Sequence, residues 1–344
     1  MRDGEVIGAD RALSGVDLSG ADLSGAIFDG AGLAGCDLSG ADLREAMLHG
    51  VRLDGAKLAG ATLAKASFHD CAMSRADLSG ADCTGWNVTG SGLRGASFAN
   101  ARLADANIVK CRLTRAIFAG ASLARANVVQ CRTDGIDLTG TDCEELALVE
   151  ADLTTALLDG VRFLRTNFVK VVFAGRNLRG LVAPVCHFNE CDMTGCDLSG
   201  ADLTQGGLAK VKAAGAVFEG ARMVRAVLLD AVLAKAVLRG ADLANAILQG
   251  ADLTEADATG AGLAQAVCVR MTAPRARFAD CDMTYADLSH ADLTDADLTG
   301  ARLARANLHA VRDRGARIPD RRHALPPDQD RLEAEQWQQR FAGI

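Results

Sequence analysis

Hydrophobic residues recur along this chain with a period of five. Written in fives from Val16, it reads VDLSG ADLSG AIFDG AGLAG CDLSG ADLRE, and the same frame continues near the other end as ADLSH ADLTD ADLTG ARLAR. The third residue of each unit, its centre, is usually Leu or Phe, and the first is usually Ala or Cys. Centres fall at every residue number ending in 3 or 8 from Leu13 to Ile318, which makes 62 units without an insertion or a deletion. A period of five matches neither an α-helix nor a strand, so it predicts coils of short extended sides joined by turns.

Glycine marks a second and longer period, of four units. The last position of every fourth unit, at positions 20, 40, 60 and onward to 300, is Gly throughout except at Asn100 and Asp280. Gly, Asn and Asp are the residues that tolerate a positive φ, which a type II turn requires at its third residue. The glycine column therefore predicts four units per coil, with one corner formed by a continuous stack of type II turns.

The segments ADLSGADLSG, CDLSGADLRE and ADLTDADLTG resemble the pentapeptide-repeat family, whose consensus is Ala-(Asp/Asn)-Leu-x-x. The resemblance covers about residues 11–318. It implies an all-β fold, a right-handed quadrilateral β-helix of roughly 15 coils, followed by a short C-terminal helix. We expect three parts: an N-terminal lead-in or cap at residues 1–12, the β-helix at 13–318, and a linker with the helix at 319–344.

The predicted helix lies in the segment RLEAEQWQQRFAGI, after the linker RRHALPPDQD. Ala334, Trp337, Phe341 and Ile344 follow one another at spacings of 3, 4 and 3, which places them on one helix face. An open last coil exposes unpaired strand edges. We therefore expect Trp337, Phe341 and Ile344 to cap that end, with dimerisation or docking through Trp337 as the alternative.

Charge and composition exclude several classes of protein. The formal net charge is −7, without the basic surplus of a nucleic-acid binder. The chain has no apolar run long enough to span a bilayer and no apolar segment of the signal-peptide kind at its start. We therefore expect no direct nucleic-acid partner, no membrane span and a cytoplasmic location. The 11 Cys, all at first or central positions, are then expected to be reduced and buried.

The motifs that invite a chemical interpretation all fall within the repeat frame. GSGLRG at residues 90–95 spells GxGxxG, which binds dinucleotides only between a strand and a helix. Cys186, Cys191 and Cys196 have a metal-like spacing; they would either hold a soft metal or, as we favour, fill the core as small apolar residues. The frame has neither a Ser–His–Asp arrangement nor an insertion that would form a pocket. We therefore expect that the chain is not an enzyme and that it binds neither a cofactor nor a metal.

One side of the predicted coil differs from the others. Its centres run from Phe28 and Leu48 to Leu308, and many of its outward positions are apolar. An apolar face commonly marks an interaction site, although β-branched residues also simply suit strands. We expect a protein partner to bind the following outward residues of this side: Val109, Val129, Val149, Val169, Val227, Leu229, Ile247, Val267 and Val269.

The sequence thus favours a non-catalytic protein–protein interaction scaffold, a rigid rod that is a monomer or a homodimer through its C-terminal helix. The family resemblance implies two alternatives. Some pentapeptide-repeat proteins resemble B-form DNA and bind a type II topoisomerase, inhibiting gyrase or protecting it from quinolones; the mixed charge of this chain departs from that pattern. Others serve as accessory or effector proteins of bacterial secretion systems.

Overall fold

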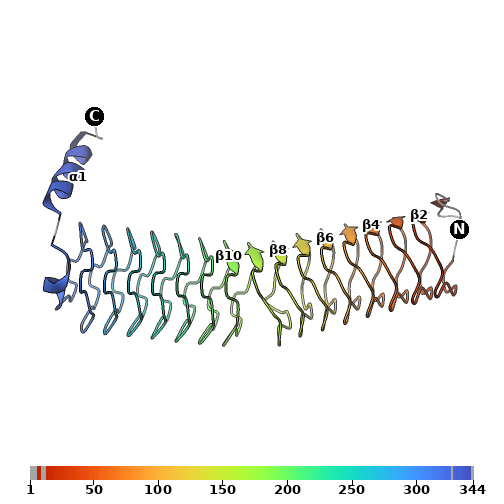
Figure 1. The fold of residues 1–344 in the computed structure, drawn as a ribbon, viewed down its shortest axis with the longest axis horizontal. Helices are drawn as coiled ribbons and strands as arrows, with labels where there is room; N and C mark the ends of the chain where they lie inside the picture. Colours follow the sequence, from red (N-terminus) through yellow and green to blue (C-terminus); the bar gives the residue numbers. More distant parts are fainter. Residues whose placement is uncertain (1–5, 9–12, 327, 342–344) are drawn as a thin grey trace. The chain divides into compact units, whose positions relative to one another are not determined.

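A computed structural model describes residues 6–8, 13–326 and 328–341 of the chain. The chain divides into two compact units, Met1–Val172 (unit 1) and Phe173–Ile344 (unit 2). Within each unit the backbone winds in stacked coils (Figure 1). Outward residues of successive coils pair in parallel, from Asp17↔Asp37 onward in unit 1 and from Asn177↔Asp197 onward in unit 2, and each pair lies four repeats apart in the sequence. The four-repeat coil predicted from the glycine column is therefore confirmed.

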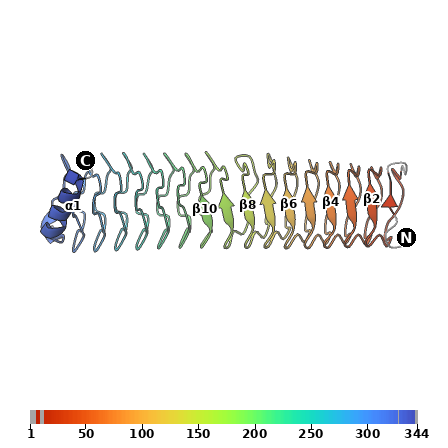
Figure 2. The ribbon, with the colours of Figure 1, turned by 90° about the horizontal axis from the view of Figure 1, so that it is seen from above.

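Unit 1 carries short parallel strands on one side of its coils, which lie side by side in Figure 2. Consecutive strands from β2 onward pair at the length of one coil, as in Phe28↔Leu48. The first strand pairs one residue further away, as in Ile7↔Phe28, so that Val6 and Ile7 add one strand before the repeat frame begins. The strands of unit 1 are β1 (Val6–Ile7), β2 (Ile27–Asp29), β3 (Met47–His49), β4 (Ser67–His69), β5 (Asn87–Thr89), β6 (Asn107–Val109), β7 (Asn127–Val129), β8 (Ala147–Val149) and β9 (Asn167–Val169).

In unit 2 the sides of the coils are joined mainly by single bridges, such as Val227↔Ile247. Its described elements are the strand β10 (His187–Asn189), the 3₁₀ helix η1 (Arg321–His323) and the helix α1 (Gln329–Phe341). None of the helices in the described part of the chain has the length and apolar character needed to cross a membrane.

The two units differ at the corner that follows the strand side. In unit 2 this corner is a closed turn, in which Ala231 N–H donates to the carbonyl of Leu228 at 3.1 Å. In unit 1 the corresponding N–H of Cys71 donates to the hydroxyl of Ser91 at 3.0 Å, one coil further along. In unit 1 the side before this open corner forms a strand, whereas in unit 2 the strand β10 precedes a closed corner, in which Cys191 N–H donates to the carbonyl of Phe188 at 3.3 Å.

All four corners of the coil hold a residue with positive φ, and not only the glycine column. Gly20 has φ of 65°, Lys65 of 58°, Lys110 of 54° and Arg115 of 58°, one residue from each corner. The sequence predicts a stack of type II turns at one corner, the glycine column; the positive φ that those turns require runs along this whole column, and it is found at the other three corners as well. Non-glycine residues in this region cost about 1 kcal/mol or more each and persist where surrounding structure enforces them. Here the hydrogen bonds between stacked coils supply that constraint, as in Lys65 N–H to the carbonyl of Thr84 at 2.9 Å.

The core is the column of centres and first positions inside each stack. Leu, Phe, Ala and Cys at these positions are buried, and even Trp86, at a first position, is fully buried. The Trp86 ring meets Phe68 edge-on at 5.3 Å between centroids and lies 6.0 Å from Phe98. Outside the core, Asp at second positions accept hydrogen bonds from the backbone two residues ahead, as Asp202 does from Thr204 N–H at 3.1 Å. These Asx turns secure the corners locally.

The last coil of unit 2 is covered by the segment that contains η1. Arg305 N–H donates to the carbonyl of His323, and Leu325 N–H donates to that of Ala306, both at 2.9 Å. These bonds satisfy backbone groups that an open last coil would leave unpaired. The residues from which we predicted a cap, the side chains of Trp337 and Phe341 and the whole of Ile344, lie outside the described residues.

Candidate functional site

The strand side of unit 1 carries a valine ladder, which we define as Val109, Val129, Val149 and Val169. Parallel pairing places these residues directly above one another, in the pairs Val109↔Val129, Val129↔Val149 and Val149↔Val169. Each valine is half-buried, because its neighbours in the adjacent coils cover part of it. What remains exposed is a continuous strip of methyl groups over β6 to β9.

Polar side chains border the valine ladder on both sides. On one side the amide of Asn107 donates to that of Asn87 at 3.0 Å, and Asn127 donates to Asn107 at 2.8 Å. On the corner beyond the valines, Gln130 donates to Glu150 at 2.9 Å. An apolar strip with a polar rim is the usual anatomy of a protein-binding patch.

Unit 2 carries the remaining apolar residues predicted from the sequence. Val227 pairs with Ile247, and Ile247 with Val267, on successive coils. Ile247 is 37% exposed. The other residues of the set are half-buried: Val227, Leu229, Val267 and Val269. They form a second apolar patch on the outward positions of unit 2.

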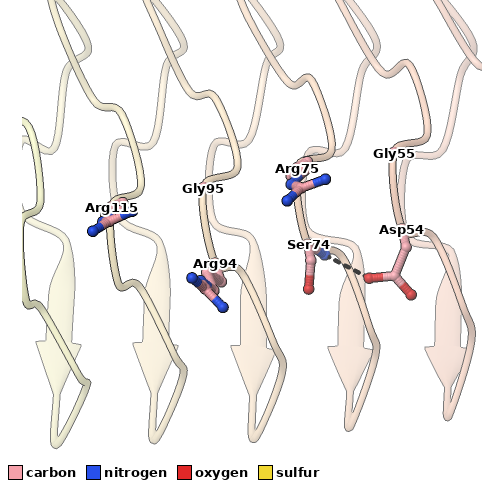
Figure 3. Close-up of a pocket in the computed structure, with 7 residues that line it drawn as sticks. All are labelled: Asp54, Gly55, Ser74, Arg75, Arg94, Gly95 and Arg115. Carbon is pink, nitrogen blue, oxygen red and sulfur yellow. Dashed lines mark hydrogen bonds between the residues drawn. The ribbon is translucent and has the colours of Figure 1, made fainter.

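A feature that the sequence reasoning missed is a groove on the neighbouring side of unit 1 (Figure 3). This arginine groove has a volume of about 500 Å³. At one end Asp54 accepts a hydrogen bond from Ser74 N–H at 2.9 Å. The residues that line the groove are Asp54, Gly55, Ser74, Arg75, Arg94, Gly95 and Arg115. A signal for it exists in the sequence, since Gly and Arg alternate from coil to coil at one corner, from Gly55 to Gly135.

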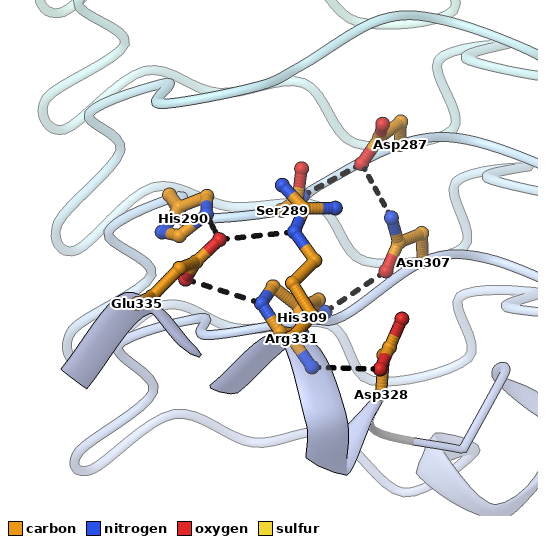
Figure 4. A network of polar contacts seen from close by, with 8 residues as sticks. All are labelled: Asp287, Ser289, His290, Asn307, His309, Asp328, Arg331 and Glu335. Carbon is orange, nitrogen blue, oxygen red and sulfur yellow. Dashed lines mark hydrogen bonds and ion pairs between the residues drawn. The ribbon is translucent and has the colours of Figure 1, made fainter. Parts of the chain in front are cut away.

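A third feature joins α1 to the side of the coils in unit 2 (Figure 4). Glu335 lies between two imidazoles, 3.4 Å from Nε2 of His290 and 3.3 Å from Nε2 of His309, and Arg331 donates to it at 2.9 Å. Burial favours the neutral form of this carboxyl, but hydrogen bonds from Arg331 and His309 outweigh burial and lower the pKa of Glu335. Asp328 begins the helix by accepting the N–H of Arg331 at 3.0 Å.

Metal-ligating side chains converge in two places among the described residues. The clusters His49–His69–Asp70 and His290–His309–Glu335 each bring three ligand atoms within 4.8 Å of one another. In the first, the two imidazoles are exposed and stack at 5.5 Å between centroids. Cys186, Cys191 and Cys196, the spacing considered from the sequence, belong to neither cluster. All three are buried in the core.

The coils define a class of protein, a β-solenoid with four five-residue sides in each coil. The family model for pentapeptide repeats matches residues 13–205, 214–266 and 275–309 in overlapping copies. The chain therefore belongs to the pentapeptide-repeat family, and the resemblance noted in the sequence is confirmed. It is a repeat scaffold of this family.

Solved structures of the same family are similar to this chain. The pentapeptide-repeat protein HetL of the cyanobacterium Nostoc sp. strain PCC 7120, involved in heterocyst differentiation regulation, is 23% identical, with 88% of each chain covered and a TM-score of 0.21. A trypsin-treated QnrB1, a plasmid-mediated fluoroquinolone resistance protein, is 18% identical over 85% of this chain and 96% of its own, with a TM-score of 0.27. A comparison with curated proteins found no match. These likenesses concern the fold alone.

Proposed function

We propose that this chain is a non-catalytic scaffold that binds a partner protein through the valine ladder of unit 1. The observation that carries the proposal is the register of the ladder, which stacks four outward valines without an intervening charge. Strands alone do not require this, because outward positions of the same columns elsewhere in unit 1 hold Asp29, His49 and His69. A rigid strip of methyl groups fits a complementary apolar surface at little cost in conformational entropy.

The partner that fits this surface is a protein with an apolar contact patch. A DNA-mimicking role would instead require a predominantly acidic surface that copies the phosphate backbone. The side next to the valine ladder is basic, because Arg75, Arg94 and Arg115 line its groove. The proposal also places the chain in the cytoplasm, a reducing compartment in which Cys111 and Cys131, stacked with Cys111 N–H 3.3 Å from the sulfur of Cys131, would stay thiols.

The experiment pairs a face variant with a matched control of equal chemistry. The face variant is Val129→Asp with Val149→Asp, and the control is Ile117→Asp with Leu157→Asp, two outward apolar residues on another side of the same unit. Ile117 and Leu157 are 39% and 52% exposed, more than the half-buried valines. In the first step, the wild-type chain is used to capture partners from the source cell. The purified partner is then titrated against the wild type, the face variant and the control.

We expect the face variant to bind at least about tenfold more weakly, because a carboxylate buried without a partner opposes association. The control is expected to bind as the wild type does. Circular dichroism and the thermal transition check that both variants keep the fold. Equal binding by the face variant and the wild type, or equal loss in the control, contradicts the proposal.

A further inference from the structure

The arginine groove carries positive charge that the described residues do not neutralise. The guanidinium groups of Arg75, Arg94 and Arg115 are ion-paired to none of the described carboxylates. Asp54, the one acidic residue of the lining, is engaged by Ser74 N–H. At another corner of unit 1, by contrast, Arg125 donates to both oxygens of Asp105 at 2.8 Å. The groove is therefore a local positive surface on a chain whose net charge is −7.

The same side of unit 1 places like charges against one another. Arg112 and Arg132 are direct neighbours in the parallel register of successive coils. Both side chains are exposed. Like charges that face each other directly are unfavourable, and these two arginines, which do not line the groove, add to the positive charge of the side on which it lies.

The groove has the dimensions of a small-ligand site. Arg75, Arg94 and Arg115 come from three consecutive coils, and stacked coils lie about 4.8 Å apart. At the corner, Gly95 lies between Arg75 and Arg115 and adds no side chain there; a Cβ at Gly95 would lie 3.8 Å from Cγ of Arg75. Figure 3 shows the three arginine side chains on successive coils, with Arg94 offset from the line through Arg75 and Arg115. A volume of about 500 Å³ lies within the range of small-molecule pockets.

The chemistry of the lining selects the ligand. A guanidinium group is planar and can donate two parallel hydrogen bonds to the oxygens of one phosphate group. Three guanidinium groups on successive coils can therefore bind a short chain of linked phosphate groups. The lining holds no aromatic side chain on which a base would stack. We propose that the arginine groove binds a compact oligophosphate, a ligand with two or three linked phosphate groups, through Arg75, Arg94 and Arg115. This site is independent of the valine ladder and of the partner proposed above.

The test uses the full chain and inorganic tripolyphosphate, titrated by calorimetry at low ionic strength. The variants are Arg75→Gln, Arg94→Gln and Arg115→Gln, and the matched control is Arg125→Gln, whose parent residue has the same φ of 58° as Arg115. Gln suits the corner positions of Arg75 and Arg115, because Gln130, Gln205 and Gln265 already hold positive φ at the equivalent position. Circular dichroism verifies that each variant is folded.

We expect saturable binding that weakens about tenfold or more in each groove variant and by less than about twofold in the control. Binding is also expected to weaken as salt rises, because the site is exposed and screened. Equal affinities of groove variants and wild type, or an equal loss in Arg125→Gln, would overturn the proposal. Tighter binding of an oligoglutamate peptide than of tripolyphosphate would also overturn it, because the groove would then be a docking site for an acidic protein segment.

Discussion

Asp257 offers a direct measurement of what the Asx turns contribute to the coil. Its side chain is 12% exposed. One carboxylate oxygen accepts from the N–H and the hydroxyl of Thr259 at 3.1 and 2.6 Å, and the other accepts from Arg239 at 2.8 Å. In Asp257→Ala the hydroxyl of Thr259 regains water, and the losses that remain are the bond to the backbone and the ion pair with Arg239, about 1 kcal/mol each. We expect a cost of about 2 kcal/mol in local stability.

The assay is amide hydrogen exchange of the coil that contains Asp257. Leu238 N–H donates to the carbonyl of Asp257 at 2.7 Å, so its exchange reports opening of this coil. A loss of about 2 kcal/mol corresponds to exchange about 30-fold faster. The matched control is Asp77→Ala, in the same column, whose side chain accepts the N–H of Ser79 at 3.0 Å. We expect about 1 kcal/mol there.

The pH dependence follows from the same contacts. Burial alone would raise the pKa of Asp257, but the bonds from Thr259 and Arg239 outweigh it and hold the pKa below its ordinary value of 3.8. The stabilisation is therefore complete above about pH 4 and is lost as the pH falls through the lowered folded-state pKa. The difference between wild type and Asp257→Ala should shrink over that range. Identical exchange of the two chains at neutral pH would refute the reasoning.

Three further changes probe the core, the amide hydrogen bonds that join Asn87, Asn107 and Asn127, and the buried thiols. Trp86→Ala should lower the free energy of unfolding by about 4 kcal/mol in chemical unfolding, because the ring is fully buried. Trp86→Phe should lower it by less than half as much, since Nε1 has no hydrogen-bond partner among the described residues. Equal losses in the two variants would contradict this. Asn107→Asp should lower the temperature of the thermal transition by an amount equivalent to about 1 kcal/mol. The reason is that a carboxylate would replace the amide that donates to Oδ1 of Asn87 at 3.0 Å. An unchanged transition temperature would count against a stabilising role of these amide hydrogen bonds. Burial raises the pKa of Cys71 to about 11. Its reaction with a thiol reagent at pH 8 should therefore proceed only as fast as the chain unfolds. Rapid labelling of Cys71 in the native chain would contradict this prediction.

The period of five and the glycine column were sufficient to predict the coil. Apolar centres and small first positions must face inward because burial of apolar surface drives the fold, and this fixes which residues stack. The register follows, so that the sequence alone places Val109, Val129, Val149 and Val169 in one column. The structure confirms that stacking, in pairs separated by one coil. Whether a partner binds there stays a prediction.

The tertiary structure decided what a repeating frame leaves undetermined. Lys65 and Arg125 adopt positive φ because every five-residue side must end in a corner, whatever residue stands there. Whether an arginine is paired depends on its neighbours one coil away. Arg125 is paired with Asp105 and has a structural role, whereas Arg94 lines the groove and is a candidate binding residue. Glu335 meets His309 only because α1 returns to the side of the stack. The local period specifies what is buried, whereas contacts between outward side chains depend on rotamers and on the close approach of different coils, which the period does not encode.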